Sequence, residues 1–151
     1  MAQKTTQDYL FVGIQLILFM AYALEPDLLT FGRSDTLGNL GLLLAVIAVL
    51  TGFGAFTFLW KKFSPFPTPV AGGELITVGP FAYARHPIYT CLVAAAFGYA
   101  FYTGSGYRMV VGLALLVLFY FKSSYEEKLL EAQYPAYSAY RKRVGRFTPW
   151  I

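Results

Sequence analysis

The sequence has 151 residues, of which 57% are hydrophobic and only 13% carry a charged side chain. Soluble domains average about 25% charged residues, so this composition excludes an ordinary soluble domain and indicates an integral membrane protein. The length suits one domain, residues 1–151. A single cysteine excludes an internal disulfide. The net charge of +4 does not require a nucleic-acid partner, because the basic residues are placed as a membrane topology signal.

Four apolar segments, at residues 9–24, 37–60, 88–103 and 107–121, predict an all-α fold. The second would form a helix of roughly 36 Å, enough to cross a hydrocarbon core of roughly 30 Å. The other three would measure roughly 20–24 Å and need flanking residues or local thinning of the bilayer. The first also resembles the core of a signal peptide, but we treat it as a membrane helix. The sequence therefore predicts a polytopic membrane helical bundle with about four transmembrane helices.

The connections between these segments differ in kind. Residues 25–36 form a short acidic loop, and "TGSG" at 103–106 is a tight turn that predicts an antiparallel hairpin of the third and fourth helices. Residues 61–86 form a long connection rich in proline and glycine. Loops of this length in compact proteins are more often functional than idle, so this connection is a candidate part of a functional site.

The basic residues predict the orientation of the bundle. With four spans, both termini lie on one side, together with the 61–86 connection. Ten of the 12 Lys and Arg residues fall on that side, whereas Arg33 and Arg108 fall on the other. The positive-inside rule then places both termini in the cytoplasm. The ten residues are Lys4, Lys61, Lys62, Arg85, Lys122, Lys128, Arg141, Lys142, Arg143 and Arg146.

A polar cluster opens the third apolar segment, in "GPFAYARHPIYTC" at residues 79–91. Pro87 fits the first position of a helix, where its missing N–H costs nothing. Tyr89 then lies about one turn after His86 on the same face. One interpretation is a plain helix start whose Arg85 reaches lipid phosphates. The other is a binding site at the cytoplasmic end of the helix.

A second polar cluster follows the fourth apolar segment. Lys122 and Glu126 are four residues apart, as are Glu127 and Glu131. This spacing predicts two polar stripes on an extension of the fourth helix. One interpretation is a solvated helix end. Against it, carboxylates so close to a membrane tend to pair or to bind a ligand. A cationic ligand, or one with ribose hydroxyls, would suit them.

The C-terminal tail mixes aromatic and basic side chains. Tyr134, Tyr137, Tyr140 and Trp150 lie among four basic residues, a pattern typical of an interfacial helix. Such a helix could also cover a site. The chain has a single histidine, and its sequence contains no zinc ligand set, P-loop or haem motif, so no metal site is predicted.

Both clusters together match a known pattern. "ELITVGPFAYARHPIYT", an apolar hairpin and "YEEKLLEAQYPAYSAYRKRVGRFTPW" resemble the isoprenylcysteine carboxyl methyltransferase family of integral membrane enzymes and, more distantly, the phospholipid methyltransferases. The resemblance covers about residues 60–151, the expected catalytic portion. It implies methyl transfer from S-adenosylmethionine at the cytoplasmic membrane face. It implies that Lys122 faces the acceptor, at a position where an arginine is usual. The cofactor pocket that it implies is lined by Gly79, Arg85, His86, Tyr89, Glu126 and Glu127.

Elementary chemistry agrees with this implication. Methyl transfer is an in-line displacement that positioning can largely drive, and a carboxylate acceptor needs no general base. Glu126 or Glu127 can balance the positive charge of the cofactor, and Arg85 and His86 can hold its carboxylate. Glu126 and Arg85 are the candidates for a catalytic role. The expected acceptor is a lipophilic or lipidated molecule delivered by the bilayer, with membrane lipids as further partners.

Two alternatives stay open. A phospholipid or other lipid amine methyltransferase would need a glutamate as base, because an amine must lose its proton before it attacks. A small membrane scaffold without enzyme activity would use the charged ends only as anchors.

Overall fold

The computed structural model describes residues 4–24, 26, 29–60, 64–69 and 72–149. Every regular element within these residues is helical, which confirms the all-α prediction. The elements are α1 (Thr6–Ala23), α2 (Asp35–Leu59), the 3-10 helix η2 (Gly79–Ala82), α3 (Pro87–Thr103), α4 (Gly106–Gln133) and α5 (Tyr137–Arg143).

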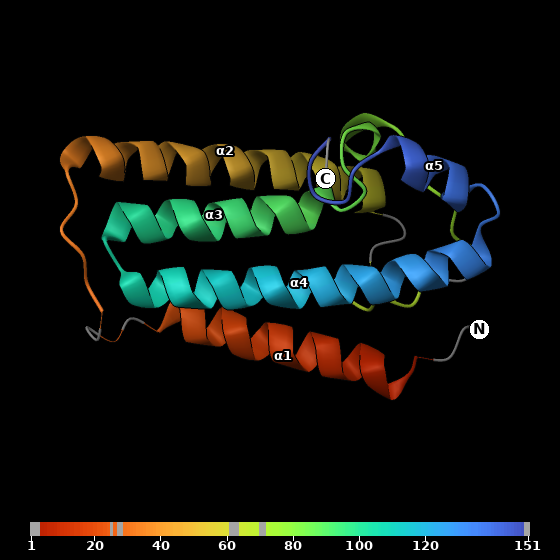
Figure 1. Cartoon of the computed structure of the whole chain (residues 1–151), viewed down its shortest axis with the longest axis horizontal. Helices are drawn as coiled ribbons and strands as arrows, with labels where there is room; N and C mark the ends of the chain where they lie inside the picture. Colours follow the sequence, from red (N-terminus) through yellow and green to blue (C-terminus); the bar gives the residue numbers. More distant parts are fainter. Residues whose placement is uncertain (1–3, 25, 27–28, 61–63, 70–71, 150–151) are drawn as a thin grey trace.

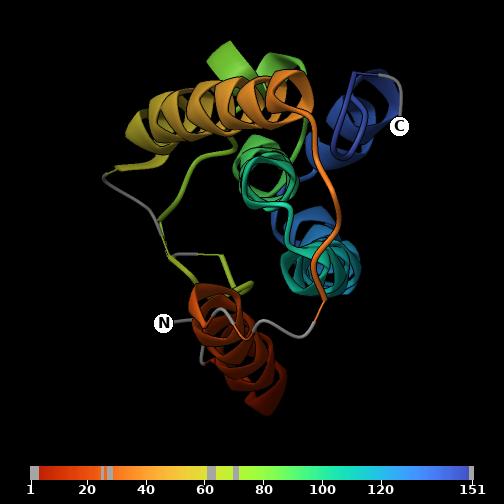
Figure 2. The same cartoon turned by 90° about the vertical axis from the view of Figure 1, so that its left-hand side faces the viewer.

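The four long helices lie side by side and alternate in direction (Figure 1). α2 packs on α3, α3 on α4, and α4 on α1. The first helix in the chain therefore lies at the edge of the bundle far from the second. Figure 2 shows α1 and α2 at opposite edges of the same bundle.

One end of the bundle gathers the segments predicted to be functional. α1 begins there, α2 ends, α3 begins, and α4 leads into α5 (Figure 1). The turn at 103–106 lies at the opposite end, and α3 and α4 form the predicted antiparallel hairpin. This arrangement is the one that the topology prediction requires, while its cytoplasmic orientation stays a prediction. Lys61 and Lys62, which contribute to that prediction, lie outside the described residues.

Side-chain caps set the starts of three of the long helices, α1, α2 and α4. Thr5 and Asp8 form a reciprocal capping box at α1, and the hydroxyls of Ser34 and Ser105 cap α2 and α4. α3 ends at Gly104, whose φ of 65° is left-handed and therefore favours glycine. Because polar caps and first turns precede the apolar runs, each long helix begins slightly before the segment that predicted it.

α2 and α3 approach each other closely through small residues. A Cβ added to Gly41 would lie 2.6 Å from the carbonyl oxygen of Gly98, and a Cβ added to Gly98 would lie 2.6 Å from the carbonyl oxygen of Gly41. Ala45, Ala48 and Ala55 continue the buried stripe along α2. Small-residue contacts of this kind let membrane helices pack by van der Waals contact. They fix the start of α3, and with it the first polar cluster, beside the end of α2.

The outer surface of the bundle suits a lipid environment. α2 and α4 are long and apolar enough to cross a membrane, and α3 is a shorter apolar helix. Large apolar side chains such as Ile17, Leu50 and Val110 are more than half exposed, as expected where lipid replaces water. The predicted membrane bundle is thus confirmed in its architecture, and the number of four crossings stays a prediction.

The chain beyond the apolar part of α4 covers the charged end of the bundle. α4 continues past Phe121 to Gln133, as the spacing of the acidic residues predicts. In α5 the side chains of Tyr137 and Tyr140 are buried, whereas the basic residues of its last turn are exposed. These tyrosines therefore face the protein, which fits a covering role. Trp150 lies outside the described residues, and the interfacial position of the tail stays a prediction.

Candidate functional site

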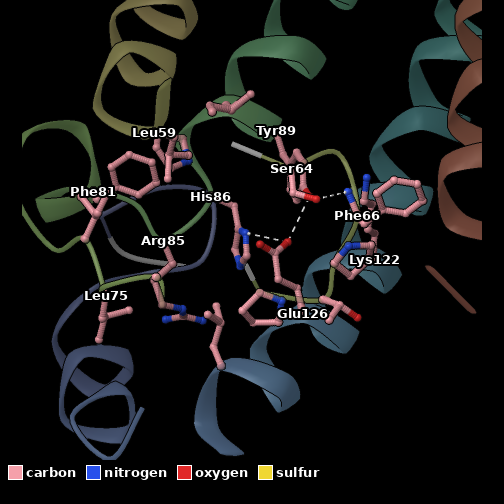
Figure 3. A pocket seen from close by; sticks show the side chains of 18 of the residues that line it. Leu59, Ser64, Phe66, Leu75, Phe81, Arg85, His86, Tyr89, Lys122 and Glu126 are labelled. Atoms are coloured by element: carbon pink, nitrogen blue, oxygen red, sulfur yellow. Dashed lines mark hydrogen bonds and ion pairs between the residues drawn. The ribbon is translucent and has the colours of Figure 1, made fainter. Parts of the chain in front are cut away.

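A cavity of about 210 Å³ lies at the charged end of the bundle. α1, residues 64–69, residues 73–76, the start of α3, the polar part of α4 and α5 all contribute to its wall (Figure 3). The structure thus brings together, around one cavity, most of the site residues that the sequence predicted. Those that line it are Arg85, His86, Tyr89, Lys122 and Glu126.

Glu127 lies behind this wall, at the centre of a cage formed by three arginines and His86. Its Oε1 atom is 2.9 Å from Arg85 Nε and 3.2 Å from His86 Nε2. Its Oε2 atom is 3.2 Å from Arg146 Nη2 and 3.7 Å from Arg141 Nε. Glu127 is only 1% exposed. A buried carboxylate with this many partners pins together the elements that carry them.

The cage also fixes the charge state of Glu127, which lies beyond the apolar part of α4. Burial alone would raise the pKa of its carboxyl. Hydrogen bonds and attraction from His86 and Arg85 outweigh burial and lower that pKa to about 2. Glu127 is therefore a permanent anion near neutral pH, and its charge is already balanced within the protein.

The C-terminal tail completes the cage and orients the start of α3. The backbone N–H groups of Arg85 and His86 donate to the carbonyl oxygens of Gly145 and Arg146, both at 2.9 Å. The Arg85 guanidinium also donates to the carbonyl oxygen of Val144. Arg85 is thus committed to holding the tail as well as Glu127, so its side chain is rigid at the edge of the cavity.

Glu126, the neighbour of Glu127, faces the cavity instead. The Tyr89 hydroxyl donates to Glu126 Oε2 at 3.0 Å, and His86 Nδ1 lies 3.8 Å from the same oxygen (Figure 3). The rings of His86, Tyr89 and Phe119 stack in parallel, with centroids 5.4 and 4.6 Å apart. The side chain of Glu126 remains 25% exposed. The stack thus orients a carboxylate that lines the cavity and keeps part of its surface open.

Lys122 lines the same cavity from one turn earlier on α4. Its Nζ atom donates to Gln15 Oε1 at 2.6 Å and to the carbonyl oxygen of Pro65 at 2.8 Å. It also lies 5.5 Å from the centre of the Tyr89 ring. Lys122 is only 1% exposed. An ammonium group and a carboxylate, Glu126, therefore stand on one cavity wall, each already oriented by neutral partners.

Gly79 has a different place from the other predicted residues. Together with Glu127, it is not among the residues that line the cavity. Its φ of +62° is left-handed, and a Cβ there would lie 2.5 Å from the ring of Phe58. Glycine therefore serves the turn into η2 and its contact with α2. Direct contact of Gly79 with a cofactor stays a prediction.

α5 closes the cavity with two buried tyrosines. The Tyr140 hydroxyl donates to the carbonyl oxygen of Phe81 at 2.5 Å. The Tyr137 hydroxyl is buried and has no hydrogen-bond partner within the described part of the chain. Burial raises the pKa of Tyr140 to about 12 and raises the pKa of Tyr137 as well, so both hydroxyls keep their protons. Tyr137 therefore offers a cavity-lining hydrogen-bond donor.

Several site residues escaped the sequence interpretation. Gln15, in the first apolar segment, contacts Lys122, and Arg146 belongs to the cage of Glu127. Gln15 could have been predicted from the sequence, because an amide side chain inside an apolar segment usually has a polar partner. Arg146 offered no such signal, since it lies in a basic tail. Among the described residues, no group of three or more His, Cys, Asp or Glu side chains could hold a metal ion.

Comparison with known proteins agrees with this architecture. The family model of the phospholipid methyltransferases matches residues 36–137. The chain superposes on the eukaryotic intramembrane Ras methyltransferase, an isoprenylcysteine carboxyl methyltransferase, with a TM-score of 0.63 at 18% identity. That alignment covers 99% of this chain and 55% of the other. At this identity the likeness concerns the fold.

Two curated relatives are heavy-metal resistance proteins. The chain is 30% identical over 77 residues to the nickel-cobalt-cadmium resistance protein of Alcaligenes xylosoxydans xylosoxydans, which covers 50% of this chain and 36% of that protein. It is 28% identical over 115 residues to the cobalt-zinc-cadmium resistance protein of Cupriavidus metallidurans. That alignment covers 76% of this chain and 48% of the relative. The chain thus spans half or less of the length of these relatives.

The match over residues 36–137 includes nearly all of α2, the whole of α3 and α4, and both polar clusters. The fold is similar to that of an intramembrane methyltransferase. The resemblance drawn from the two polar clusters is therefore confirmed. The chain belongs to the phospholipid methyltransferase family.

Proposed function

We propose that this protein transfers a methyl group from S-adenosylmethionine to a lipophilic acceptor at the cytoplasmic face of a membrane. The observation that carries the proposal is the division of work between two adjacent carboxylates. Glu127 is saturated by cations inside the protein, whereas Glu126 faces the cavity with open surface. A cavity that presents such a carboxylate suits a donor that carries positive charge.

The residues around the cavity fit S-adenosylmethionine, whose sulfonium and amino groups are positive. Glu126 can accept from the amino group, and His86 lines the same wall for its carboxylate. The unpartnered hydroxyl of Tyr137 supports a polar ligand, because buried polar groups are nearly always hydrogen-bonded. When bound, this cofactor supplies a methyl group activated for displacement, and the electron pair of the broken C–S bond stays on sulfur.

The protein's own contribution is positioning. The ring stack orients Glu126, the tail and the Glu127 cage hold the start of α3, and Gln15 and Pro65 hold Lys122. These groups are set before a ligand arrives, so little reorganisation is needed to align donor and acceptor. α5 covers the cavity with Tyr137 and Tyr140 and limits the access of water.

A second, apolar cleft supports a lipophilic acceptor. It has a volume of about 640 Å³ and lies between α1 and α2, which the fold keeps apart. It shares Leu92 with the polar cavity. An acceptor could place its apolar tail there and its reactive head near Lys122. The cleft is lined by Phe19, Tyr22, Leu42, Ala45, Val46, Val49, Leu50, Leu92, Ala95, Ala96, Tyr99 and Leu115.

The acceptor head could be a carboxylate or an amine. A carboxylate can pair with Lys122 and needs no base. A lipid amine would have to lose a proton, for which Glu126 is the cavity-facing candidate. A screen of both acceptor classes with a radiolabelled methyl donor distinguishes them. We expect long-tailed acceptors to be methylated faster than short polar ones with the same head, and equal turnover would contradict a bilayer-delivered acceptor.

Binding of S-adenosylhomocysteine to the detergent-purified chain tests the donor directly. We expect a saturable heat in calorimetry and a thermal shift that grows with ligand concentration. Absence of both at millimolar ligand would contradict the proposal and favour a scaffold without enzyme activity. Impermeant cysteine labelling of the tail in intact cells tests the orientation, and labelling from outside would contradict cytoplasmic termini.

A further inference from the structure

A short proline-rich segment forms one wall of the cavity. We call residues 64–69, "SPFPTP", the strap; all six of its residues line the cavity. Pro67 is almost completely buried. The strap has no helical or strand hydrogen bonds of its own. Its position therefore depends on side chains from the helices beside it.

Asp8, in the first turn of α1, supplies the strongest attachment. It accepts from the backbone N–H of Thr68 at 3.0 Å and from the Thr68 hydroxyl at 2.5 Å. It also accepts from the backbone N–H of Thr5 at 2.7 Å. Asp8 is completely buried. Capping α1 requires only the bond to Thr5, so the two bonds to Thr68 serve the strap.

Further contacts tie the strap to both sides of the cavity. The ring of Phe66 packs edge-on against Tyr9 of α1, with centroids 5.3 Å apart, and Lys4 Nζ lies 3.7 Å from the centre of the Phe66 ring. On the other side, the carbonyl oxygen of Pro65 accepts from Lys122. The strap thus bridges α1 and α4, and the Lys122 ammonium depends on it for one of its hydrogen bonds.

We propose that Asp8 is a positioning residue: by anchoring Thr68, it holds the strap as a wall of the cavity and thereby fixes and shields Lys122. The role of Lys122 toward an acceptor rests on the proposed function, but the anchoring does not. Asp8 touches no reacting group in this scheme. It acts through Thr68 and the Pro65 carbonyl.

Matched variants of both partners test the anchor without any need for activity. Asp8→Ala removes it, Thr68→Val removes only the hydroxyl at nearly constant volume, and Thr68→Ser restores the hydroxyl. Ser34→Ala is the control, because it removes the cap of α2 at the opposite end of the bundle. The first readout is acylation of Lys122, quantified by mass spectrometry with the exposed Lys128 as internal reference.

The second readout is the distance between spin labels at Ser64→Cys and Lys128→Cys, in a background that carries Cys91→Ala. We expect Asp8→Ala and Thr68→Val to speed acylation of Lys122 by about tenfold, as loss of a charge-assisted hydrogen bond implies, and to broaden the distance distribution. Thr68→Ser and Ser34→Ala should match the parent in both readouts. Unchanged Lys122 acylation or an unchanged distribution in Asp8→Ala would overturn the proposal. Failure to bind S-adenosylhomocysteine would instead overturn the proposed function.

Discussion

The two faces of the polar part of α4 each carry a glutamate, Glu126 on one and Glu127 on the other, and these two side chains have opposite surroundings. On one face, Glu127 is 1% exposed and has the side chains of three arginines and His86 within 4 Å. On the other, Glu126 accepts from the neutral hydroxyl of Tyr89 and opens onto a cavity that it shares with Lys122. The charge of Glu127 is balanced within the protein, whereas the charge of Glu126 is available to a ligand in the cavity.

This difference separates residues that stabilise the site from residues that contact its ligand. Removal of one partner from a buried ion cluster leaves other charges unpaired, so its main effect is on stability. Removal of a cavity-facing charge leaves the protein largely intact and acts on the ligand. Variants of the two faces should therefore have different kinds of effect. Three of them, together with one variant of the cavity-lining Tyr137 in α5, test the comparison.

Glu127→Ala should have the largest effect. It would leave the side chains of Arg85 and Arg146, only 9% and 16% exposed, without their anionic partner, at a cost of about 3–5 kcal/mol in the free energy of unfolding. Thermal unfolding in detergent measures this loss. Glu131→Ala is the matched control, because Glu131 forms an exposed pair with Arg141 at 2.9 Å and should cost less than about 1 kcal/mol. Equal stability of the two variants would show that the cage does not hold the fold.

Glu126→Gln should weaken binding of the methyl donor and its product. The variant keeps its shape but loses the charge that faces the cavity, so the affinity for S-adenosylhomocysteine should fall about tenfold to a hundredfold. Its unfolding temperature should stay close to that of the parent. Calorimetry and a thermal melt on one preparation give both values. Strong destabilisation of Glu126→Gln would mean that both faces serve the fold.

The contrast between the faces could not be read from the sequence. The apolar runs and the four-residue spacing of the acidic side chains predicted the long helices and the polar part of α4, because these patterns are local. Adjacent helical residues point about 100° apart, yet only contacts from distant segments decide which one is buried. Glu127 meets Arg85 from 42 residues away, and Asp8 meets Thr68 from 60 residues away. Neither pair leaves a local signature.

Lys122→Met should affect the acceptor more than the donor. Methionine keeps the apolar stem and loses the ammonium, so the apparent KM for a carboxylate acceptor should rise about tenfold, as expected when a charged hydrogen bond is lost. Affinity for S-adenosylhomocysteine should change little. Steady-state kinetics over acceptor concentration, with calorimetry on the same variant, separates the two. Lys122→Arg should retain acceptor use, and an equal loss in both variants would point to packing instead of charge.

Tyr137→Phe should have the smallest effect on binding. Loss of one neutral hydrogen bond costs about 0.5–1.5 kcal/mol, or roughly two- to tenfold in affinity for S-adenosylhomocysteine. The free protein should become slightly more stable, because an unpartnered buried hydroxyl is removed. Tyr140→Phe is the contrast, since that hydroxyl bonds to Phe81 and its loss should destabilise the free protein. Lower stability of ligand-free Tyr137→Phe would show that its hydroxyl is already satisfied.

The most direct test of the division between the two faces is the thermal shift produced by S-adenosylhomocysteine in the parent, Glu126→Gln and Glu131→Gln. The division predicts a shift that grows with ligand concentration in the parent and in Glu131→Gln, and is strongly reduced in Glu126→Gln although the ligand-free proteins melt at similar temperatures. A shift of full size in Glu126→Gln would contradict the assignment of Glu126 to the ligand. So would the absence of any shift in the parent.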